Sequence, residues 1–371
     1  MRTKMLALVA VGMIATGGMA ACTNDGNEGS SSDSGGNRGG GGGGKVGVIL
    51  PDTKTSQRWG SDDPKLLKAA FDAADVPVDI QNAEGDKQRF QQIATDMIAG
   101  GVKVLMIVNL DSGTGKAVLD KAKAAGVKTI DYDRLTLNGG ADYYVSFDNE
   151  AVGTLQGKGL VRCLGEKKYS KPVVADLNGS PTDNNATLFK AGYDDVLQPK
   201  FDEGVFIKGP DQSVADWDND EAKTVFREMW TQTNHKINGV LAANDGLANA
   251  TIDVLKTSKM NGKVPVTGQD ATIEGLQNIL AGDQCMTVYK AIKREADAAA
   301  DLAIKLYKGE QVTAPDEVKD PESGDDVKSF LEKPTAIFKE DVNLVIKDGF
   351  VEKKAVCSGR YAAMCREAGI K

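Results

Sequence analysis

The sequence predicts an α/β fold of two similar lobes, each built on a parallel sheet that is covered by helices on both faces. Short apolar runs alternate with amphipathic helical segments from Lys45 onward. The apolar runs are nearly continuous in Val, Leu and Ile, as in strands that are buried on both faces. The chain has 371 residues, of which 41% are hydrophobic and 26% charged, which is typical of a globular protein with about two domains.

The first series of predicted elements lies between residues 46 and 132. Apolar residues at helical spacing predict helices, and short runs rich in Val and Ile predict strands. We expect strands at 46–50, 78–81, 102–108 and 127–132, and helices at 62–75, 90–99 and 117–125. Gly100, Gly101 and Gly126 follow two of these helices and are typical C-caps. The alternation indicates βα units and therefore a parallel sheet.

The second series has the same character and predicts the second lobe. We expect strands at 173–177, 239–243 and 264–267, and helices at 184–197, 221–233, 247–258 and 273–281. Met229 and Trp230 lie inside one of these helices and are expected in the core, whereas Trp217 precedes it in a loop and is freer to meet a ligand. In open parallel sheets ligands bind beyond the carboxyl ends of the strands, so the residues after each run are candidate site residues.

The amino terminus has the pattern of an export signal. Arg2 and Lys4 precede an uncharged, mainly apolar run at 5–16, which is too short to span a bilayer. Met19-Ala20-Ala21-Cys22 resembles the bacterial lipobox, so we expect a signal peptide at 1–21 and lipidation of Cys22; an ordinary secretory signal is the alternative. Residues 22–44 are rich in Gly and Ser and predict a flexible tether. The expected location is the outer face of the cell membrane, held by a lipid anchor.

Composition and spacing exclude several classes of function. The formal net charge of −8 argues against nucleic acid as a partner. His235 is the sole histidine, which excludes a multi-histidine metal site and leaves no choice of a Ser-His or Cys-His relay. The segment 112–116 resembles a P-loop but lacks its first glycine and its hydroxyl residue, and the Asp216, Asp218, Asp220 spacing lacks the glycine and glutamate of a calcium loop. Both predict helix starts, and no cofactor or metal is expected.

Polar and aromatic residues follow the predicted strands in a consistent way. They are Arg58, Trp59, Asp133, Arg134, Asp148, Asn149, 183–185, Asn244, Asp245, Gln269, Asp270 and Lys290. A single Asp or Asn after a strand is as readily a helix N-cap or a turn residue. Together, however, carboxylates, amides and guanidinium groups bridge neighbouring hydroxyls, and tryptophan covers the C–H face of a pyranose. The set predicts a carbohydrate ligand.

Six segments resemble the xylose-binding proteins of bacterial ABC importers, which belong to the periplasmic sugar-binding proteins. The segments are 132–134 (Tyr-Asp-Arg), 146–150 (Ser-Phe-Asp-Asn-Glu), 179–186 (Gly-Ser-Pro-Thr-Asp-Asn-Asn-Ala), 244–245 (Asn-Asp), 268–271 (Gly-Gln-Asp-Ala) and 286–290 (Met-Thr-Val-Tyr-Lys). They occur in the family's order between about 45 and 311. The resemblance implies a type I periplasmic binding protein, with two Rossmann-like lobes joined by a hinge of three crossovers and the sugar between them.

The resemblance also implies a set of site residues and lobe boundaries. The polar contacts fall on Arg58, Asp133, Arg134, Asp183, Asn185, Asn244, Asp270 and Lys290, with Trp59 and Trp217 as the stacking pair. The loop at 51–57 departs from the family pattern, which has an Asp-Asp pair there, so its contacts stay open. The expected lobes are 45–147 plus about 290–330, and 148–289 plus about 331–371.

Four cysteines remain in the exported body, and they allow three disulfide pairings. Cys357 and Cys365 are close in sequence beside a C-terminal helix. The family topology places Cys163 and Cys285 together in the second lobe, so we expect Cys163–Cys285 and Cys357–Cys365. Four free buried thiols are the alternative.

The expected function is non-enzymatic capture of a monosaccharide by a monomer, with an aldopentose such as xylose as the first candidate, and its delivery to an ABC permease. Asp183 and Asp270 resemble a glycosidase pair, but Arg134 and Lys290 should keep both ionised and leave no general acid. The alternative function is sensing, in which the closed, liganded form docks on a sensor kinase or chemoreceptor. The sequence leaves open whether pentoses or hexoses bind.

Overall fold

The computed structural model describes residues 44–56 and 58–370. The expected signal peptide at 1–21, the lipidation of Cys22 and all but the last residue of the expected tether at 22–44 lie outside these residues. Among the described residues, no helix combines the length and the apolar character that crossing a bilayer requires.

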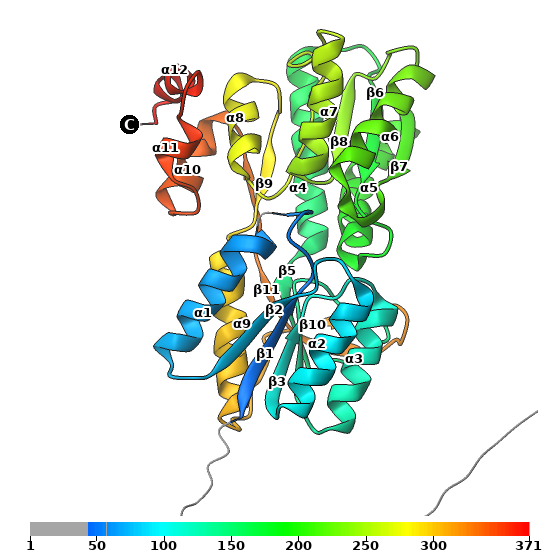
Figure 1. Ribbon diagram of the computed structural model, residues 1–371. Coiled ribbons are helices and arrows are strands. Elements are labelled where there is room, and N and C mark those ends of the chain that lie inside the picture. The colour runs from blue at the N-terminus through cyan, green and yellow to red at the C-terminus, as the bar shows by residue number, and fades with distance from the viewer. Residues whose placement is uncertain (1–43, 57, 371) are drawn as a thin grey trace, which may run out of the picture. The chain divides into compact units, whose positions relative to one another are not determined.

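The first lobe is built on a seven-stranded sheet with the order β10-β11-β5-β4-β3-β1-β2 (Figure 1). Its strands are β1 (Lys45–Leu50), β2 (Val78–Asn82), β3 (Val102–Ile107), β4 (Lys128–Tyr132), β5 (Tyr143–Phe147), β10 (Asp316–Lys319) and β11 (Asp326–Glu332). All neighbours are parallel except β10 and β11, which are antiparallel. The four strands predicted in this lobe are confirmed, whereas β5, β10 and β11 were not predicted.

Helices cover both faces of this sheet, as the continuous apolar strands predict. They are α1 (Asp63–Ala73), α2 (Lys87–Ala99), α3 (Ser112–Ala124) and α9 (Ile292–Tyr307). Val48 packs into the core shared with α1 and α9, and the next residue, Ile49, into the core shared with α2 and α3 (Figure 1). Gly101 and Gly126 follow α2 and α3 with φ of 80° and 71°, the left-handed conformation that glycine adopts at least cost.

The second lobe has a three-stranded parallel sheet in the order β7-β6-β8. Its elements are α4 (Asn149–Lys167), β6 (Val173–Asn178), α5 (Asn184–Asp202), β7 (Ile207–Ser213), α6 (Asn219–Gln232), β8 (Gly239–Ala242), α7 (Asp245–Thr257) and α8 (Ile273–Ala281). Met229 and Trp230 are buried in its core, as expected. The predicted helix at 273–281 has those bounds in the structure, but α4 and β7 were not predicted.

The strand predicted at 264–267 is wrong. In the structure this run makes a single parallel bridge, between Val240 and Val266, and no continuous ladder. The run contains Pro265, which has no N–H to donate to a neighbouring strand, and its carbonyl accepts from Val240 N instead. The apolar pattern therefore indicated burial correctly and regular pairing incorrectly.

Both motif-like segments set aside above are capped helix starts. Asp111 precedes α3, and its side chain accepts a hydrogen bond from Thr114 N. Asp218 precedes α6 and accepts from Asp220 N and Glu221 N. No group of metal-ligating side chains gathers anywhere in the described part of the chain.

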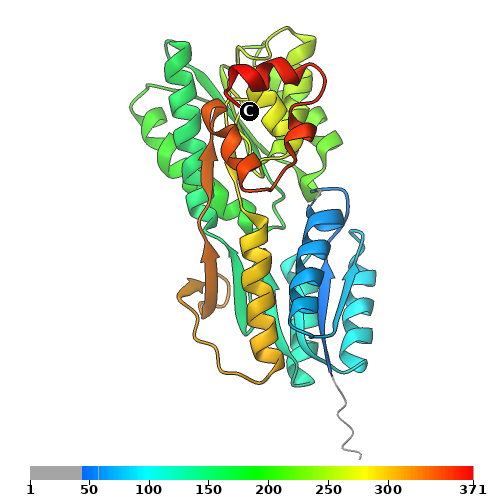
Figure 2. The same cartoon turned by 90° about the vertical axis from the view of Figure 1, so that its left-hand side faces the viewer.

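The C-terminal segment packs against α8 of the second lobe (Figure 2). It consists of β12 (Thr335–Ile337), which pairs antiparallel with β9 (Thr287–Tyr289), a 3₁₀ turn (Lys339–Asp341), α10 (Val342–Lys347), α11 (Lys353–Val356) and α12 (Tyr361–Glu367). The structure contains the two expected disulfides, Cys163–Cys285 and Cys357–Cys365, with Cα–Cα distances of 6.4 and 5.8 Å. The first ties α4 to the segment before β9.

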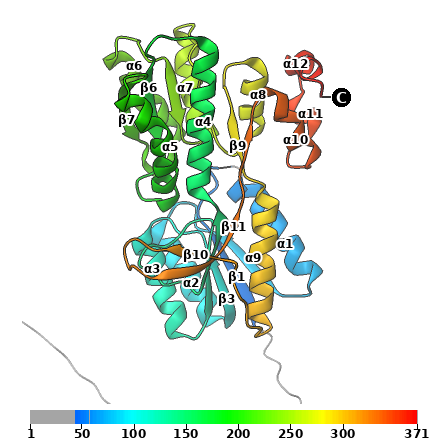
Figure 3. The ribbon, with the colours of Figure 1, turned by 180° about the vertical axis from the view of Figure 1, so that it is seen from behind.

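The chain passes between the two lobes at three places (Figure 3). These are Asp148 between β5 and α4, 290–291 between β9 and α9, and 333–334 between β11 and β12. Asp148 N donates to Glu332 O at 2.9 Å, so two of the crossings are joined directly. Short connections of this kind between two lobes are typical of a hinge.

Asp176 on β6 gives a test of the second lobe's electrostatics. Its side chain is 1% exposed, its Oδ1 has no partner among the described residues, and burial raises its pKa to about 7. An unfolded aspartate has a pKa of about 3.9. The folded state therefore takes up a proton between these values, and this group's contribution to the free energy of unfolding falls as pH rises from about 4 to about 7.

We expect Asp176→Asn, which cannot ionise, to raise the melting temperature more at pH 8 than at pH 4.5. The measurement is thermal unfolding of both proteins across that range. Asp195→Asn, at an exposed position on α5, is the matched control and should change little at either pH. An effect of Asp176→Asn that does not grow with pH would show that the carboxyl stays charged in the folded protein.

Candidate functional site

The structure brings all ten predicted site residues to the lining of one small inner cavity at the strand ends of both lobes. They are Arg58, Trp59, Asp133, Arg134, Asp183, Asn185, Trp217, Asn244, Asp270 and Lys290. Thr55, Ser56, Phe189 and Gln269 complete the lining. The cavity volume is about 40 Å³. A water molecule needs about 10–15 Å³ on this measure, so the cavity admits roughly three waters.

Arg58 lies in a π-helical turn (Arg58–Asp62) before α1 and is held by three buried carboxylates. Its Nε and Nη2 donate to Asp63 at 2.9 and 2.8 Å, its Nη1 to Asp133 at 2.8 Å, and its Nη2 to Glu295 at 2.6 Å. Burial alone would lower the pKa of Arg58, but the carboxylates, Asp63 first, raise it well above its ordinary value. Most of the donors of this side chain are therefore used inside the first lobe.

The ring of Trp59 stacks against the guanidinium group of Arg58. The guanidinium carbon is 4.0 Å from the centroid of the Trp59 ring, and the ring is 2% exposed. One face of the indole is thus covered by a cation–π contact. A sugar that stacks on this face has to displace the guanidinium group.

Asp133 of the first lobe and Asn185 of the second lobe both line the cavity and are joined by a hydrogen bond. Asn185 Nδ2 donates to Asp133 O at 2.9 Å, and Asn185 Oδ1 accepts from Asn149 Nδ2 at 3.0 Å. Ser146 Oγ also donates to Asp133 O, at 2.7 Å. Burial would raise the pKa of Asp133, but Arg58, Lys290 and Arg134 lower it below its usual value, so this carboxylate is ionised.

Arg134 and Asp183 form the second contact between the lobes. Arg134 Nε lies 3.0 Å from Asp183 Oδ2, although the N–H is not directed at the oxygen, and Arg134 Nη1 donates to Asn109 O at 3.1 Å. Asp183 is also the N-cap of α5, where its side chain accepts from Asn185 N at 2.9 Å. The capping role and the cavity role, which were alternatives in the sequence, coexist in this residue.

Trp217 reaches the cavity but is less free than its loop position in the sequence suggested. It ends a 3₁₀ turn (Ala215–Trp217), is 7% exposed and belongs to the core of the second lobe. Its Nε1 donates to Asp183 Oδ2 at 3.1 Å, and its ring packs edge-on against Phe189 at 6.4 Å between centroids. Gly179 lies so close to the indole that no Cβ would fit there. The ring is therefore fixed in place, which suits a stacking surface but also makes it part of the core.

Lys290 and Asp270 form the third charged group of the cavity. Lys290 Nζ lies 3.4 Å from Asp270 Oδ1, and the lysine is 5% exposed. Burial would lower the pKa of Lys290, but Asp270 and Asp133 raise it above its ordinary value, so the ammonium stays charged. No hydrogen bond from this ammonium to another described residue accompanies the ion pair. Two of its three protons remain available to a ligand.

Three of the ten residues have left-handed backbone, which is uncommon outside glycine. Asp133, Trp217 and Asp270 have φ of 63°, 56° and 99°. Such conformations cost free energy and persist where the surrounding structure imposes them, which is often at binding sites. No local sequence pattern marks these positions.

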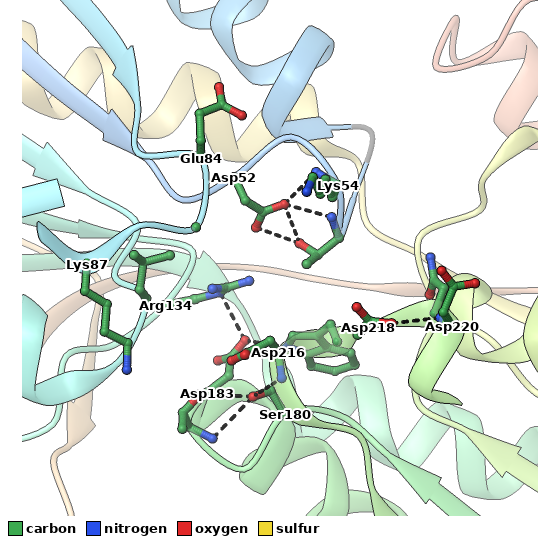
Figure 4. Close-up of a pocket in the computed structure, with 16 residues that line it drawn as sticks. Asp52, Lys54, Glu84, Lys87, Arg134, Ser180, Asp183, Asp216, Asp218 and Asp220 are labelled. Atoms are coloured by element: carbon green, nitrogen blue, oxygen red, sulfur yellow. Dashed lines mark hydrogen bonds and ion pairs between the residues drawn. The ribbon is translucent and has the colours of Figure 1, made fainter. Parts of the chain in front are cut away.

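A larger outer pocket adjoins the inner cavity and shares Thr55, Arg134, Asp183 and Trp217 with it (Figure 4). Its volume is about 440 Å³. The labelled side chains come from both lobes: Asp52, Lys54, Glu84, Lys87 and Arg134 from the first, and Ser180, Asp183, Asp216, Asp218 and Asp220 from the second. Asp52 Oδ1 accepts from Lys54 N and Thr55 N, which fixes the loop that departs from the family pattern.

Several residues that shape the cavity were not predicted as site residues. Asp63 and Glu295 lie in the first turns of α1 and α9, where an acidic residue is ordinarily read as a partner of the helix dipole. Phe189 lies on the inner face of α5 and carries the pattern of a core residue. Gln269 is one of the polar residues that follow the predicted strands, and this position is the one feature of the sequence that indicates a place in the site.

The charges of the cavity pair with one another. The three cations Arg58, Arg134 and Lys290 each contact at least one carboxylate. A charged ligand would find no uncompensated partner, whereas hydroxyl groups can both donate to and accept from such pairs. The arrangement suits a small, neutral, polyhydroxylated molecule.

The comparisons with known proteins agree with this geometry. Residues 46–311 match the model of the periplasmic binding protein domain. The chain is 36% identical to the D-xylose-binding periplasmic protein of Escherichia coli, over 82% of this chain and 90% of that protein. It is 35% identical to a multiple sugar-binding periplasmic receptor of Rhizobium radiobacter, over 82% and 89%.

Solved structures show the same fold. The crystal structure of a carbohydrate transporter solute-binding protein from Chloroflexus aurantiacus, in complex with D-glucose, superimposes with a TM-score of 0.76 at 29% identity, covering 84% of this chain and 97% of that one. Both the family model and the relatives span the two lobes that line the cavity. The chain therefore belongs to the periplasmic binding protein family and has its type I fold, with relatives named for binding sugars.

Proposed function

We propose that this protein is an extracytoplasmic solute-binding protein that captures a monosaccharide, D-xylose in the first place, and delivers it to an ABC permease. The observation that carries the proposal is the convergence of paired charges, side-chain amides and two indoles from both lobes on one inner cavity. The relatives from Escherichia coli and Haemophilus influenzae, named as D-xylose-binding, favour this sugar. The protein acts by binding and not by catalysis.

Binding requires the two lobes to move. A cavity of about 40 Å³ is far smaller than the roughly 300 Å³ or more of typical ligand pockets, so a pyranose enters only when the lobes part. We propose that the lobes are 45–147 plus about 290–330 and 148–289 plus about 331–371, and that they rotate about the three crossings. The sugar contacts both lobes together only when they approach, so its binding favours the closed form.

The paired carboxylates support binding. Asp183 and Asp270 each face a cation, at 3.0 and 3.4 Å. Each of these ion pairs offers charge-assisted hydrogen bonds to the hydroxyl groups of a sugar, which suits a binding site.

Two features of the proposal rest on the sequence. The lipobox-like segment at 19–22 supports lipid anchoring at Cys22 on the outer face of the membrane. A relative named as a receptor supports sensing as the second candidate, with the liganded form docking on a sensor in addition to a permease.

The test is thermal unfolding of the purified protein with D-xylose, L-arabinose, D-ribose, D-glucose and D-galactose, followed by calorimetry. A ligand that binds only the folded state stabilises it by about 2.7 kcal/mol at a concentration 100 times its Kd. We expect the largest increase in melting temperature with D-xylose. A larger increase with a hexose would contradict the xylose assignment, and no increase with any of the five would contradict sugar binding.

A further inference from the structure

Gln269 stands between two predicted ligand residues at the strand ends of the second lobe. Its backbone pairs with Val288, one residue from β9's end at Tyr289, and its carbonyl accepts from Asp245 N at 2.9 Å. Asn244 and Lys290 follow the neighbouring strands β8 and β9. Because the carboxyl ends of parallel strands lie side by side, the three side chains line one edge of the inner cavity.

The side chain of Gln269 makes no hydrogen bond to the described residues, and its Oε1 is a buried atom. The residue is 3% exposed, and its Oε1 has no hydrogen-bond partner among the described residues. Its Nε2 likewise donates to no group that the structure describes, because Gln269 makes none of the side-chain hydrogen bonds found there. Buried polar groups in folded proteins are nearly always paired, so a buried, unpaired Oε1 and an Nε2 without a hydrogen bond, in a residue that lines a cavity, indicate an absent partner.

Two other buried glutamines show what a structural role looks like in this lobe. Gln156 Nε2 donates to Ala242 O, Ala243 O and Gly268 O at 3.0–3.3 Å. Gln284 Nε2 donates to Asp245 Oδ1 at 2.8 Å. The Oε1 atoms of Gln156 and Gln284 are buried and unpaired as well, but their Nε2 atoms donate to groups of their own lobe. Gln269 differs because its side chain makes no hydrogen bond at all to the described residues, and because it belongs to the lining of the inner cavity.

We propose that Gln269 is a specificity-determining residue whose amide hydrogen-bonds a hydroxyl group of the bound sugar, an inference that rests on the proposed function. A hydroxyl both donates and accepts, so it can satisfy Oε1 or Nε2. The neighbouring groups have matching capacity: Asn244 uses its Oδ1 to cap α7 at Leu247 N, and Lys290 has protons to spare beyond Asp270. Gln269, Asn244 and Lys290 can thus hydrogen-bond neighbouring hydroxyl groups of one sugar ring.

The consequence is discrimination against deoxy sugars. When a ligand lacks the hydroxyl that Gln269 meets, the amide stays buried and unpaired in the complex, and the analogue is rejected. A bound water molecule is the competing partner, since the cavity has room for one. Water alone would satisfy the amide without any effect on the choice of sugar.

The test replaces Gln269 with methionine, which has a similar length and no amide, in the full chain. We expect the affinity for D-xylose to fall by about tenfold to a hundredfold in calorimetry. We expect the melting temperature without sugar to stay the same or rise, because an unpaired buried amide is replaced by an apolar group of the same shape. This combination is opposite to that of a residue needed for folding.

Gln156→Met is the matched control. The same change at an amide that holds three carbonyls should lower the melting temperature without sugar. An unchanged affinity of Gln269→Met for D-xylose would overturn the inference in favour of water. A lowered melting temperature of Gln269→Met, similar to that of Gln156→Met, would also overturn it, in favour of a structural role.

Deoxy analogues of D-xylose identify the hydroxyl. The analogue that lacks the hydroxyl bound by Gln269 should bind to the wild-type protein and to Gln269→Met with equal affinity, whereas D-xylose itself should bind more tightly to the wild-type protein. A constant ratio of the two affinities over all analogues would contradict a direct contact. If the wild-type protein binds neither D-xylose nor any other sugar of the panel, the proposed function fails and the inference with it; if it binds and only the variant comparison fails, the proposed function stands.

Discussion

Replacing Arg58 with methionine should lower the free energy of unfolding of the sugar-free protein by about 3 to 5 kcal/mol, the loss expected when one partner of a buried charge network is removed. Asp63 and Glu295 are fully buried and Asp133 is 4% exposed, and all three accept hydrogen bonds from the same guanidinium. Without Arg58 the three carboxylates stay buried in a low-dielectric interior, and no other cation among the described residues contacts all three of them. Chemical denaturation in the absence of sugar measures the effect.

The loss should depend on pH. Burial raises the pKa of Glu295 above its usual value, with Asp133 and Asp63 adding to the effect, so this carboxyl takes up a proton more readily than an exposed one. Protonation relieves the repulsion that Arg58 otherwise cancels. The destabilisation by Arg58→Met should therefore be larger at pH 8 than at pH 5.

Arg134→Met is the matched control, because Arg134 faces one carboxylate, Asp183, across the lobes. It should cost less stability than Arg58→Met and should reduce sugar affinity. A variant Arg58→Met that unfolds like the wild-type protein would show that Arg58 is free to act mainly as a sugar ligand. The measurement therefore decides between two roles for Arg58. It either contacts the sugar, as the family resemblance implies, or mainly stabilises the three buried carboxylates of the first lobe.

Replacing Asp270 with asparagine should reduce sugar affinity by about 1.5 to 3 kcal/mol, or roughly tenfold to more than a hundredfold, because a charge-assisted acceptor becomes a neutral amide. Asparagine is preferred to alanine here because Asp270 has a φ of 99°, and Asn tolerates positive φ better than alanine does. The change also removes the partner of Lys290. The affinity is measured by calorimetry with D-xylose, together with a melting curve without sugar.

Asp253→Asn provides the control for this substitution in the same lobe, because Asp253 is exposed on α7 and is not among the residues that line the cavity. Its sugar affinity should equal that of the wild-type protein. If Asp270→Asn binds sugar normally but melts at a lower temperature, Asp270 is a structural residue and the ligand lies elsewhere. If it binds weakly and melts normally, the carboxylate contacts the ligand.

Trp217 illustrates how the structure changes an experiment that the sequence suggests. From its loop position, truncation to alanine should affect sugar binding alone. In the structure the indole fills the space beside Gly179 and packs on Phe189, so truncation also removes core packing. Substitution by phenylalanine keeps an aromatic face and most of the volume, and is the better way to examine stacking.

The sequence by itself predicted the βα alternation and the two lobes, which follow from local information. Its polar strand ends marked most of the cavity lining, and the resemblance to sugar-binding proteins then selected the ten site residues. Apolar runs such as 46–50 and 102–108 mark buried strands, and parallel strands deliver whatever follows them to the same edge of a sheet. Arg58 and Lys290 are far apart in the sequence, but both follow strands, and the order of strands and helices therefore already predicts that both lie at the cavity.

Only the tertiary structure decided how those residues pair. Arg58 and Glu295 are separated by 237 positions, and each is typical of its own helix start, so nothing local joins them. The single bridge at Val266 in place of a strand, the left-handed backbone of Asp133 and Asp270, and the unpaired amide of Gln269 also depend on what surrounds each residue. Local patterns indicate burial and capping, whereas packing between distant segments determines the partner of a buried charge or amide. That packing gives Arg58 three carboxylate partners and leaves the side chain of Gln269 without a hydrogen bond to the described residues.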